Sequence, residues 1–335
     1  MRALVARNYG PADTLRMADV PVPEPGPGQI QVRVKAASLN PADLMLTSGV
    51  VREAFETTFP FIPGSDFAGT VTELGPGIDG FAVGDEVFGF GSPPSYTARF
   101  KVLSLTSGAL AEYATFQADG PFVVRRPDGL SPELAASLAS TGLTAAAALQ
   151  DGAFQPGEKI LVIGATGGIG SILVPLLARE KKAEVIATTI PEYESHIAGL
   201  GAAESIDYLA HDVVAETLRR HPEGVDAIVN TALHGDRLIE TGRALRPGGR
   251  LLSTTPGTPG HDAFGRDDIT VTVVNGPPSV TPETLPTLAA RALDGTVPDM
   301  ISRWYGFDEA DRAYRDFATA HHTRGKFVIS MCDGL

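Results

Sequence analysis

Cysteine is almost absent from this 335-residue chain, and no apolar run approaches the roughly 20 residues that span a bilayer. The single cysteine, Cys332, excludes an internal disulfide and a cysteine-rich metal site, and it fits a reducing cytoplasm. We expect the paired His321 and His322 to lie in a solvated loop and not to form a ligand site, because neighbouring side chains on an extended segment point apart. Basic residues number 27 against 40 acidic ones, and the net charge of −13 argues against nucleic acid and anionic membranes as partners.

Two regions of different character follow one another along the chain. The first is β-rich, because residues 30–37 and 69–74 alternate apolar and polar side chains, which is typical of a small, partly open β-barrel. The second alternates strands with helices and predicts an α/β fold with a parallel, doubly wound sheet. The predicted strands of that sheet are 160–163, 184–188, 227–230, 249–253 and 269–274. We expect one domain at residues 1–123 and 278–335, and the other at residues 124–277.

A glycine-rich turn follows the apolar strand 160–163 and precedes an apolar helical stretch, 169–177. The turn consists of Gly164, Ala165, Thr166, Gly167, Gly168, Ile169 and Gly170. Glycines let the backbone approach a pyrophosphate, and the free N–H groups and dipole of the helix N-terminus attract the anion. The strand before the turn and the helix after it supply the context that this motif requires. The sequence therefore predicts a dinucleotide-binding site.

Six further motifs are spread over essentially the whole chain. They are Asn40-Pro41-Ala42-Asp43, Gly64-Ser65-Asp66-Phe67-Ala68-Gly69, Gly84-Asp85-Glu86-Val87, Ala111-Glu112-Tyr113, Thr141-Gly142-Leu143-Thr144 and Gly325-Lys326. In this order they resemble the medium-chain dehydrogenase/reductase superfamily, and most of all its zinc-free quinone oxidoreductase (zeta-crystallin-like) branch, which also contains enoyl reductases. The resemblance implies a GroES-like catalytic domain, a Rossmann-type nucleotide-binding domain and a homodimer or higher oligomer. We expect the strand 269–274 to pair across the two-fold axis.

The sequence departs from the zinc-dependent members of the superfamily at their metal ligands. Those members carry cysteine where this chain has Asn40, histidine where it has Ser65, and a third ligand near Ser137 or Leu138. Asn40 and Ser65 are poor zinc ligands, and Asp66 alone cannot hold the ion, so we expect no metal. Without a Lewis acid, the favoured acceptor is one that is already electron-poor. We therefore expect hydride transfer to a quinone or an α,β-unsaturated carbonyl.

The end of the second strand of the parallel sheet bears on the choice of cofactor. NAD enzymes usually carry an acidic residue there, whereas this strand ends at Thr188 and Thr189. The missing acid favours NADPH, with NADH as the alternative. The two threonine hydroxyls are candidates for the 2′-phosphate, and Lys181, Lys182 or a distant arginine could supply charge. By resemblance, Tyr208 contacts the adenosine end.

Asn40 is the one candidate catalytic residue. By resemblance it lies near the nicotinamide or the substrate oxygen, where its amide could donate to a developing oxyanion. The alternative is an asparagine that only holds the turn before Pro41. Asp43 is expected to be a structural carboxylate or helix cap, and Lys326 is either beside the nicotinamide or a surface lysine. The further residues that the resemblance brings to the nicotinamide are Thr141, Thr254, Val274, Asn275 and Lys326.

Two other functions remain open at this stage. One is an enoyl-thioester reductase, and the other is a non-catalytic NADPH-binding regulator or structural protein, since a fold does not fix a function. The loop at residues 91–108 is long enough to be a candidate for shaping substrate choice. The expected partner is a small electrophilic substrate, with no nucleic acid and no membrane.

Overall fold

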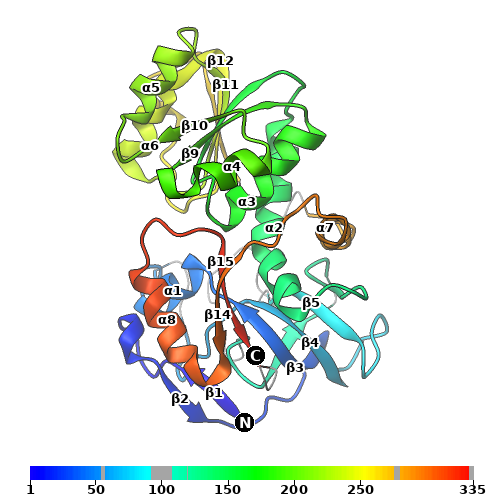
Figure 1. The fold of residues 1–335 in the computed structure, drawn as a ribbon. Helices are drawn as coiled ribbons and strands as arrows, with labels where there is room; N and C mark the ends of the chain where they lie inside the picture. Colours follow the sequence, from blue (N-terminus) through cyan, green and yellow to red (C-terminus); the bar gives the residue numbers. More distant parts are fainter. Residues whose placement is uncertain (54–56, 92–107, 119, 275–279, 332–335) are drawn as a thin grey trace.

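A computed structural model describes residues 1–53, 57–91, 108–118, 120–274 and 280–331. Within these residues two large sheets lie at opposite ends of the molecule, and the long helix α2 (Pro132–Gly152) runs between them (Figure 1). A small antiparallel ribbon, β1 (Arg2–Val5) with β2 (Arg16–Asp19), lies at the outer end of one sheet. In the described part of the chain, no helix is both long enough and apolar enough to cross a bilayer.

The first large sheet has seven strands in the described residues, and most of its pairs are antiparallel. Its strands are β3 (Gln29–Ser38), β4 (Asp66–Leu74), β5 (Glu86–Phe90), β6 (Tyr113–Gln117), β7 (Val123–Arg125), β14 (Ile301–Gly306) and β15 (Lys326–Ser330). The end of the chain joins this sheet, because β15 pairs antiparallel with β3 and parallel with β14. Lys326 at the start of β15 therefore comes close to Asn40, which follows β3.

The second large sheet has six parallel strands in the described residues, in the order β10-β9-β8-β11-β12-β13. This is the order of a dinucleotide-binding Rossmann fold, so the predicted fold class is confirmed. The strands are β8 (Lys159–Ile163), β9 (Glu184–Thr189), β10 (Glu204–Asp207), β11 (Val225–Asn230), β12 (Leu245–Ser253) and β13 (Thr270–Val273).

Alternate residues of β8 enter different cores, which makes the sheet doubly wound. Ile160 and Val162 belong to the apolar cluster that includes α2 and α3 (Gly168–Pro175), whereas Leu161 and Ile163 belong to the cluster that includes α6 (Gly235–Thr241). A strand that is buried on both faces reads as a continuous apolar run, as the sequence does here. The remaining helices are α1 (Pro41–Ser48), α4 (Glu194–Leu200), α5 (Val213–Arg220), α7 (Thr284–Leu293) and α8 (Ala310–Thr319).

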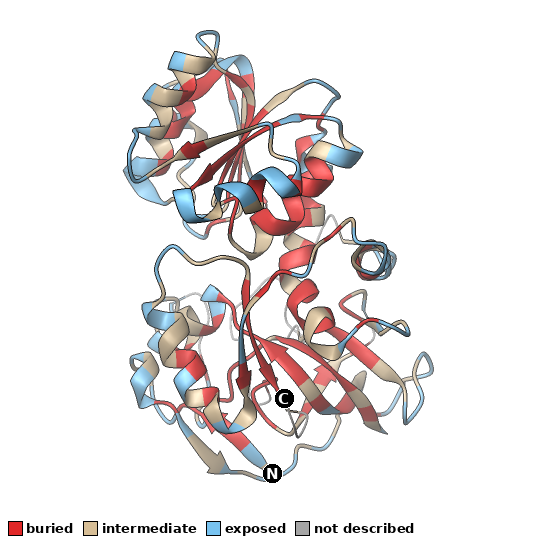
Figure 2. Cartoon of the chain, in the orientation of Figure 1, coloured by how far each residue is buried: buried red, intermediate tan, exposed pale blue. Residues whose placement is uncertain are grey.

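Helix α2 connects the two halves of the molecule. It begins after Ser131, whose Oγ accepts a hydrogen bond from Leu134 N at 3.1 Å, with Pro132 in the first turn. Its many small side chains let it pack closely against β3, β4, β5 and β15 and also against α3 and α7. Most of the helix is buried (Figure 2), and its apolar cluster contains residues from both sheets. This packing brings Ser140 next to Asp66 of the first sheet and Thr141 next to Gly168 of the glycine turn.

Candidate active site

The glycine turn after β8 needs glycine at both of its ends. Gly164 has a φ of 80°, and a Cβ there would overlap Thr231 Oγ1. A Cβ on Gly170 would lie 2.5 Å from Ala165 Cα. The turn is closed by Gly167 N, which donates to Gly164 O at 3.1 Å. The backbone therefore follows a tight path that larger residues would block.

The N-terminus of α3 suits an anion. Its cap residue is Gly167, and no side chain caps the helix. The amides of Gly168, Ile169 and Gly170 belong to the first turn, where N–H groups have no intrahelical acceptor, and the helix dipole adds partial positive charge. These features fit the pyrophosphate of a dinucleotide.

Two threonine hydroxyls brace this turn from behind. Thr188 Oγ1 accepts a hydrogen bond from Gly164 N at 3.1 Å, and Thr231 Oγ1 donates to Ile163 O at 2.9 Å. Both Thr188 and Thr189 are buried, and Thr189 Oγ1 donates to Ile190 O at 3.2 Å. In this structure both hydroxyls are engaged inside the protein, and their predicted contact with a 2′-phosphate stays a prediction.

The segment before β15 reaches across to the glycine turn. Gly325 N donates to Thr166 O at 2.8 Å, and Gly325 forms a parallel bridge with Gly167. Gly325 has a φ of 60° and no room for a Cβ beside Met300 O. The next side chain, Lys326, packs on the turn so closely that a Cβ on Gly168 would lie 2.9 Å from Lys326 Cδ.

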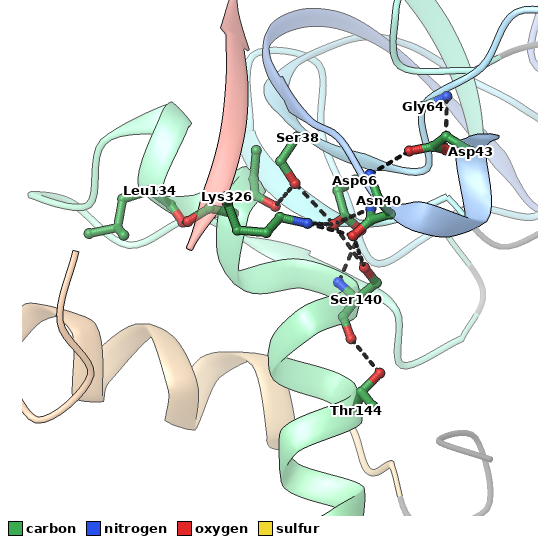
Figure 3. Close-up of polar contacts among 11 residues, drawn as sticks. Ser38, Asn40, Asp43, Gly64, Asp66, Leu134, Ser140, Thr144 and Lys326 are labelled. Carbon is green, nitrogen blue, oxygen red and sulfur yellow. Dashed lines mark hydrogen bonds and ion pairs between the residues drawn. The ribbon is translucent and has the colours of Figure 1, made fainter. Parts of the chain in front are cut away.

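On the other side of Lys326, the buried carboxylate of Asp66 accepts hydrogen bonds from several polar groups (Figure 3). Asp66 is 0% exposed, and its Oδ2 accepts from Ser38 Oγ at 3.0 Å, Asn40 Nδ2 at 2.9 Å and Ser140 Oγ at 2.8 Å. Its Oδ1 accepts from Ser140 N at 3.0 Å. Lys326 Nζ lies 3.5 Å from Asp66 Oδ2. The carboxylate is therefore saturated with donors and paired with a cation.

Lys326 also donates to Asn40, with 2.5 Å between Nζ and Oδ1. Lys326 is only 5% exposed, so the alternative of a surface lysine is wrong. Burial lowers the pKa of the Lys326 ammonium, while the carboxylates of Asp66 and Asp43 oppose that shift. The site thus combines a buried cation with an asparagine amide directly beside the glycine turn.

Asp43 holds the other side of Asn40. Its Oδ2 accepts from Asn40 N at 2.8 Å and its Oδ1 accepts from Gly64 N at 3.3 Å, so the expected role as a structural helix cap is confirmed. Burial raises the pKa of Asp43 to about 7, and the hydrogen bond from Asn40 N and the charge of Lys326 act against that rise.

The positions that hold zinc in metal-dependent relatives carry other groups here. Ser137 Oγ donates to Leu134 O at 2.8 Å, Leu138 lies in the apolar core, and Asp66 already accepts from four side chains or backbone groups besides Lys326. Nowhere in the described ranges do three or more His, Cys, Asp or Glu residues gather closely enough to hold a metal ion. These residues do not fit a catalytic zinc.

Comparison with known proteins agrees with this architecture. Residues 26–128 match the alcohol dehydrogenase GroES-like domain, and residues 200–329 match a family described as zinc-binding dehydrogenase. A chloroplast envelope quinone oxidoreductase homolog of Arabidopsis thaliana is 31% identical over 98% of both chains. The chain belongs to the medium-chain dehydrogenase/reductase superfamily.

Two further relatives of this dehydrogenase/reductase are informative. The quinone oxidoreductase structure from Coxiella burnetii has a TM-score of 0.86 and 27% identity, with 99% of each chain covered. A 2-methylene-furan-3-one reductase of Solanum lycopersicum is 29% identical over 77% of this chain and 66% of its own length. The predicted membership and the GroES-like domain are confirmed, and the chain is an oxidoreductase of a family that uses nicotinamide cofactors.

Three other residues that are expected near the nicotinamide belong to the described part of the chain: Thr141, Thr254 and Val274. Thr141 is buried on α2, with its methyl group 3.2 Å from where a Cβ on Gly168 would be. Thr254 follows β12, and its N–H donates to Asn230 O at 3.0 Å. Val274 follows β13 and donates to Ser253 O at 2.8 Å. Asn275 and most of the loop at 91–108 lie outside the described residues.

A second group of polar side chains surrounds the carboxyl ends of β9 and β10 in this dehydrogenase/reductase. Tyr208 Oη and His322 Nδ1 are 2.9 Å apart. Tyr208 is half-buried, and His322 is exposed, as expected for the histidine loop. Arg324 lies 3.4 Å from His196 Nδ1, and burial together with Arg324 lowers the pKa of His196. Arg324 is therefore the permanent cation of this group.

Sequence reasoning missed Ser38, Ser140, Asn230 and Arg324 as parts of the site. Asn230 is buried at the end of β11, and its Nδ2 donates to Ser253 Oγ at 3.0 Å and to Leu233 O at 3.0 Å. A signal for Asn230 was present, because a polar residue at the carboxyl end of a parallel strand faces the ligand edge. The serines and Arg324 carried no comparable local signal.

Proposed function

We propose that this chain is a zinc-independent, NADPH-dependent reductase that transfers hydride to a quinone or an α,β-unsaturated carbonyl. The observation that carries the proposal is the buried group of Lys326, Asn40 and Asp66 directly beside the glycine turn. The names of the relatives, quinone oxidoreductases and a 2-methylene-furan-3-one reductase, support the same class of acceptor. Residues 1–123 and 278–335 would form the substrate side, and residues 124–277 the nucleotide side.

The residues of this chain would orient the reactants and stabilise charge. The glycine turn and the first amides of α3 would hold the pyrophosphate, and the reduced nicotinamide, when bound, supplies the hydride. Asn40 would donate a hydrogen bond from Nδ2 to the acceptor oxygen, where negative charge develops. Conjugation in the acceptor spreads that charge, so hydrogen bonding replaces a Lewis acid. The reduced product then takes up one proton from water.

The choice of NADPH rests on the charges near β9 and β10. No acidic residue ends β9, which stops at Thr189 and is followed by Ile190. Arg324 lies 3.4 Å from His196, and a guanidinium is a side chain that can pair with a 2′-phosphate. Arg324 is our candidate for the distant arginine that the sequence left unassigned.

Zinc independence rests on the donor set. Asp66 is paired with Lys326, and a zinc ion would have to displace that cation and gain ligands from Asn40 or Ser65. Prolonged dialysis against a strong chelator should therefore leave the rate unchanged. A loss of activity that added zinc restores would refute this part.

The assay is cofactor oxidation by the purified protein with three acceptor panels: quinones, enones and enoyl thioesters. Turnover with quinones or enones supports the proposal, and a clear preference for enoyl thioesters selects that reductase class instead. Tight NADPH binding without hydride transfer to any panel would favour a regulator or structural protein and reject the proposal.

A homodimer or higher oligomer is part of the proposal. Among the described strands, β13 is at the edge of the parallel sheet and pairs only with β12. Its last residue, Val273, is an exposed apolar side chain, which suits pairing across a two-fold axis. The expectation of a cytoplasmic location stays a prediction.

A further inference from the structure

We propose that Lys326 and Asp66 are positioning residues that act through Asn40, by fixing the direction of its amide and strengthening its N–H toward the acceptor oxygen. The inference rests on the proposed function, because Asn40 is the group that would meet the acceptor. It concerns how a site without a Lewis acid stabilises the developing charge. The contacts among the buried side chains of Asn40, Asp66 and Lys326 support the inference (Figure 3).

The direction of the Asn40 amide follows from the chemistry of its two charged neighbours, and Ser140 Oγ agrees with it by donating to Asn40 Oδ1 at 3.3 Å. A lysine ammonium only donates hydrogen bonds and a carboxylate only accepts them. The amide oxygen must therefore face Lys326 Nζ, at 2.5 Å, and the amide nitrogen must face Asp66 Oδ2, at 2.9 Å. In the reverse orientation the amide NH2 would face the lysine ammonium, two donors, and the amide oxygen would face the carboxylate, two acceptors. The amide is thus held in one of its two orientations from both ends.

This orientation leaves one N–H for a ligand. The amide nitrogen of Asn40 carries two hydrogens, and Asp66 is its acceptor among the described residues. Asn40 is 9% exposed, so the side chain is held by the protein while a small part of it remains accessible. The second N–H is therefore available to the acceptor oxygen without any change of the amide direction.

The buried charges also polarise that amide. Lys326 is 5% exposed and Asp66 is 0% exposed, so their hydrogen bonds to Asn40 act in a medium of low dielectric constant. A cationic donor on the amide oxygen draws electron density toward it and makes the N–H groups stronger donors, as in other hydrogen-bonded chains. Asp66 balances the charge of Lys326, so the site does not hold an isolated buried cation.

The same lysine touches the nucleotide side. Its Cδ and Cγ pack on Gly168, where a Cβ would lie 2.9 Å and 3.3 Å from them. One side chain therefore spans from the glycine turn to Asn40. A change at Lys326 can alter cofactor binding as well as the acceptor step, and the experiment must separate the two effects.

The experiment measures kcat with the best acceptor and the Kd for NADPH by fluorescence titration. We expect Asn40→Ala to lower kcat about 100-fold. We expect Lys326→Met to lower it about 10-fold, with a change in Kd of less than about threefold, and Lys326→Arg to restore part of the rate. Lys159→Met is the matched control, because Lys159 forms a surface ion pair with Glu184 at 3.4 Å.

A double-mutant cycle tests whether the lysine acts through Asn40. In the Asn40→Ala background, Lys326→Met should lower kcat by less than about threefold, since the group that it positions is gone. Lys326→Met leaves Asp66 without its cation and could prevent folding. The doubly neutral variant Asp66→Asn/Lys326→Met then carries the test, with the same expected loss in kcat.

Three results would overturn the inference alone. The first is an unchanged kcat in Lys326→Met, and the second is a full 10-fold loss of kcat when Lys326→Met is added to Asn40→Ala. The third is an effect of Lys326→Met that lies wholly in the Kd for NADPH. Absence of turnover in the wild-type protein with every acceptor would instead overturn the proposed function, and the inference with it. The two failures are therefore distinguishable.

Discussion

The tight turn after β8 allows a sharp test by Gly170→Ala. A Cβ on Gly170 would lie 2.5 Å from Ala165 Cα and C, and these are backbone atoms that cannot rotate away. Helix propensity alone would favour alanine by about 1 kcal/mol. Overpacking of a rigid site costs roughly 1–3 kcal/mol, and the backbone clash puts this site at the upper end of that range. We therefore expect a net loss of about 2 kcal/mol in the free energy of unfolding.

The assay is denaturant unfolding of Gly170→Ala beside a matched control, Gly199→Ala. Gly199 lies in α4, is exposed, and has no atom within 4 Å of the place that a Cβ would take. Helix propensity should therefore act alone there and raise the free energy of unfolding by up to about 1 kcal/mol. The two substitutions should move stability in opposite directions. A Gly170→Ala protein as stable as the wild type, with unchanged NADPH affinity, would refute the reasoning about the turn.

Three further predictions concern pH, cofactor choice and assembly. Because the folded pKa of Asp43, about 7, is above its ordinary value, its contribution to stability is complete below about pH 4 and is lost as the pH rises through 7. The loss is up to about 4 kcal/mol, and unfolding titrations of Asp43→Asn between pH 4 and 8 should lack this slope. Arg324→Gln should raise the KM for NADPH about 10-fold and leave that for NADH unchanged; equal changes for both cofactors would exclude a 2′-phosphate role. Val273→Lys should shift the protein toward monomer in light scattering, and an unaltered oligomer would exclude the β13 edge.

The sequence was most informative where the signal is local. The apolar run of β8 and the glycines after it follow from neighbouring residues, and the strand expected at 160–163 lies within β8 (Lys159–Ile163). β10 (Glu204–Asp207) was missed because it is short and polar, with Ile206 as its one fully buried side chain. The helix expected at 169–177 ends at Pro175 and continues as a π-type turn, since proline lacks the N–H for the ladder.

The polar group around Asp66 could not be predicted in the same way. Lys326 is 286 residues from Asn40 and 260 from Asp66 in sequence, and only the pairing of β15 with β3 brings them together. The sequence by itself marks Asp66 only as an inadequate metal ligand, and it leaves Lys326 equally consistent with a surface position. Likewise, the burial of Thr188 depends on the packing of β9 against β8, which residue type does not reveal.

In the proposed function this chain passes hydride from NADPH to a conjugated acceptor without a metal. The most direct measurement uses NADPH deuterated at the reactive ring carbon, chelator-treated protein and an α,β-unsaturated ketone, followed by mass spectrometry of the product. The account predicts one non-exchangeable deuterium at the carbon β to the carbonyl. A product without deuterium, or deuterium transfer that appears only after zinc is added, would contradict it.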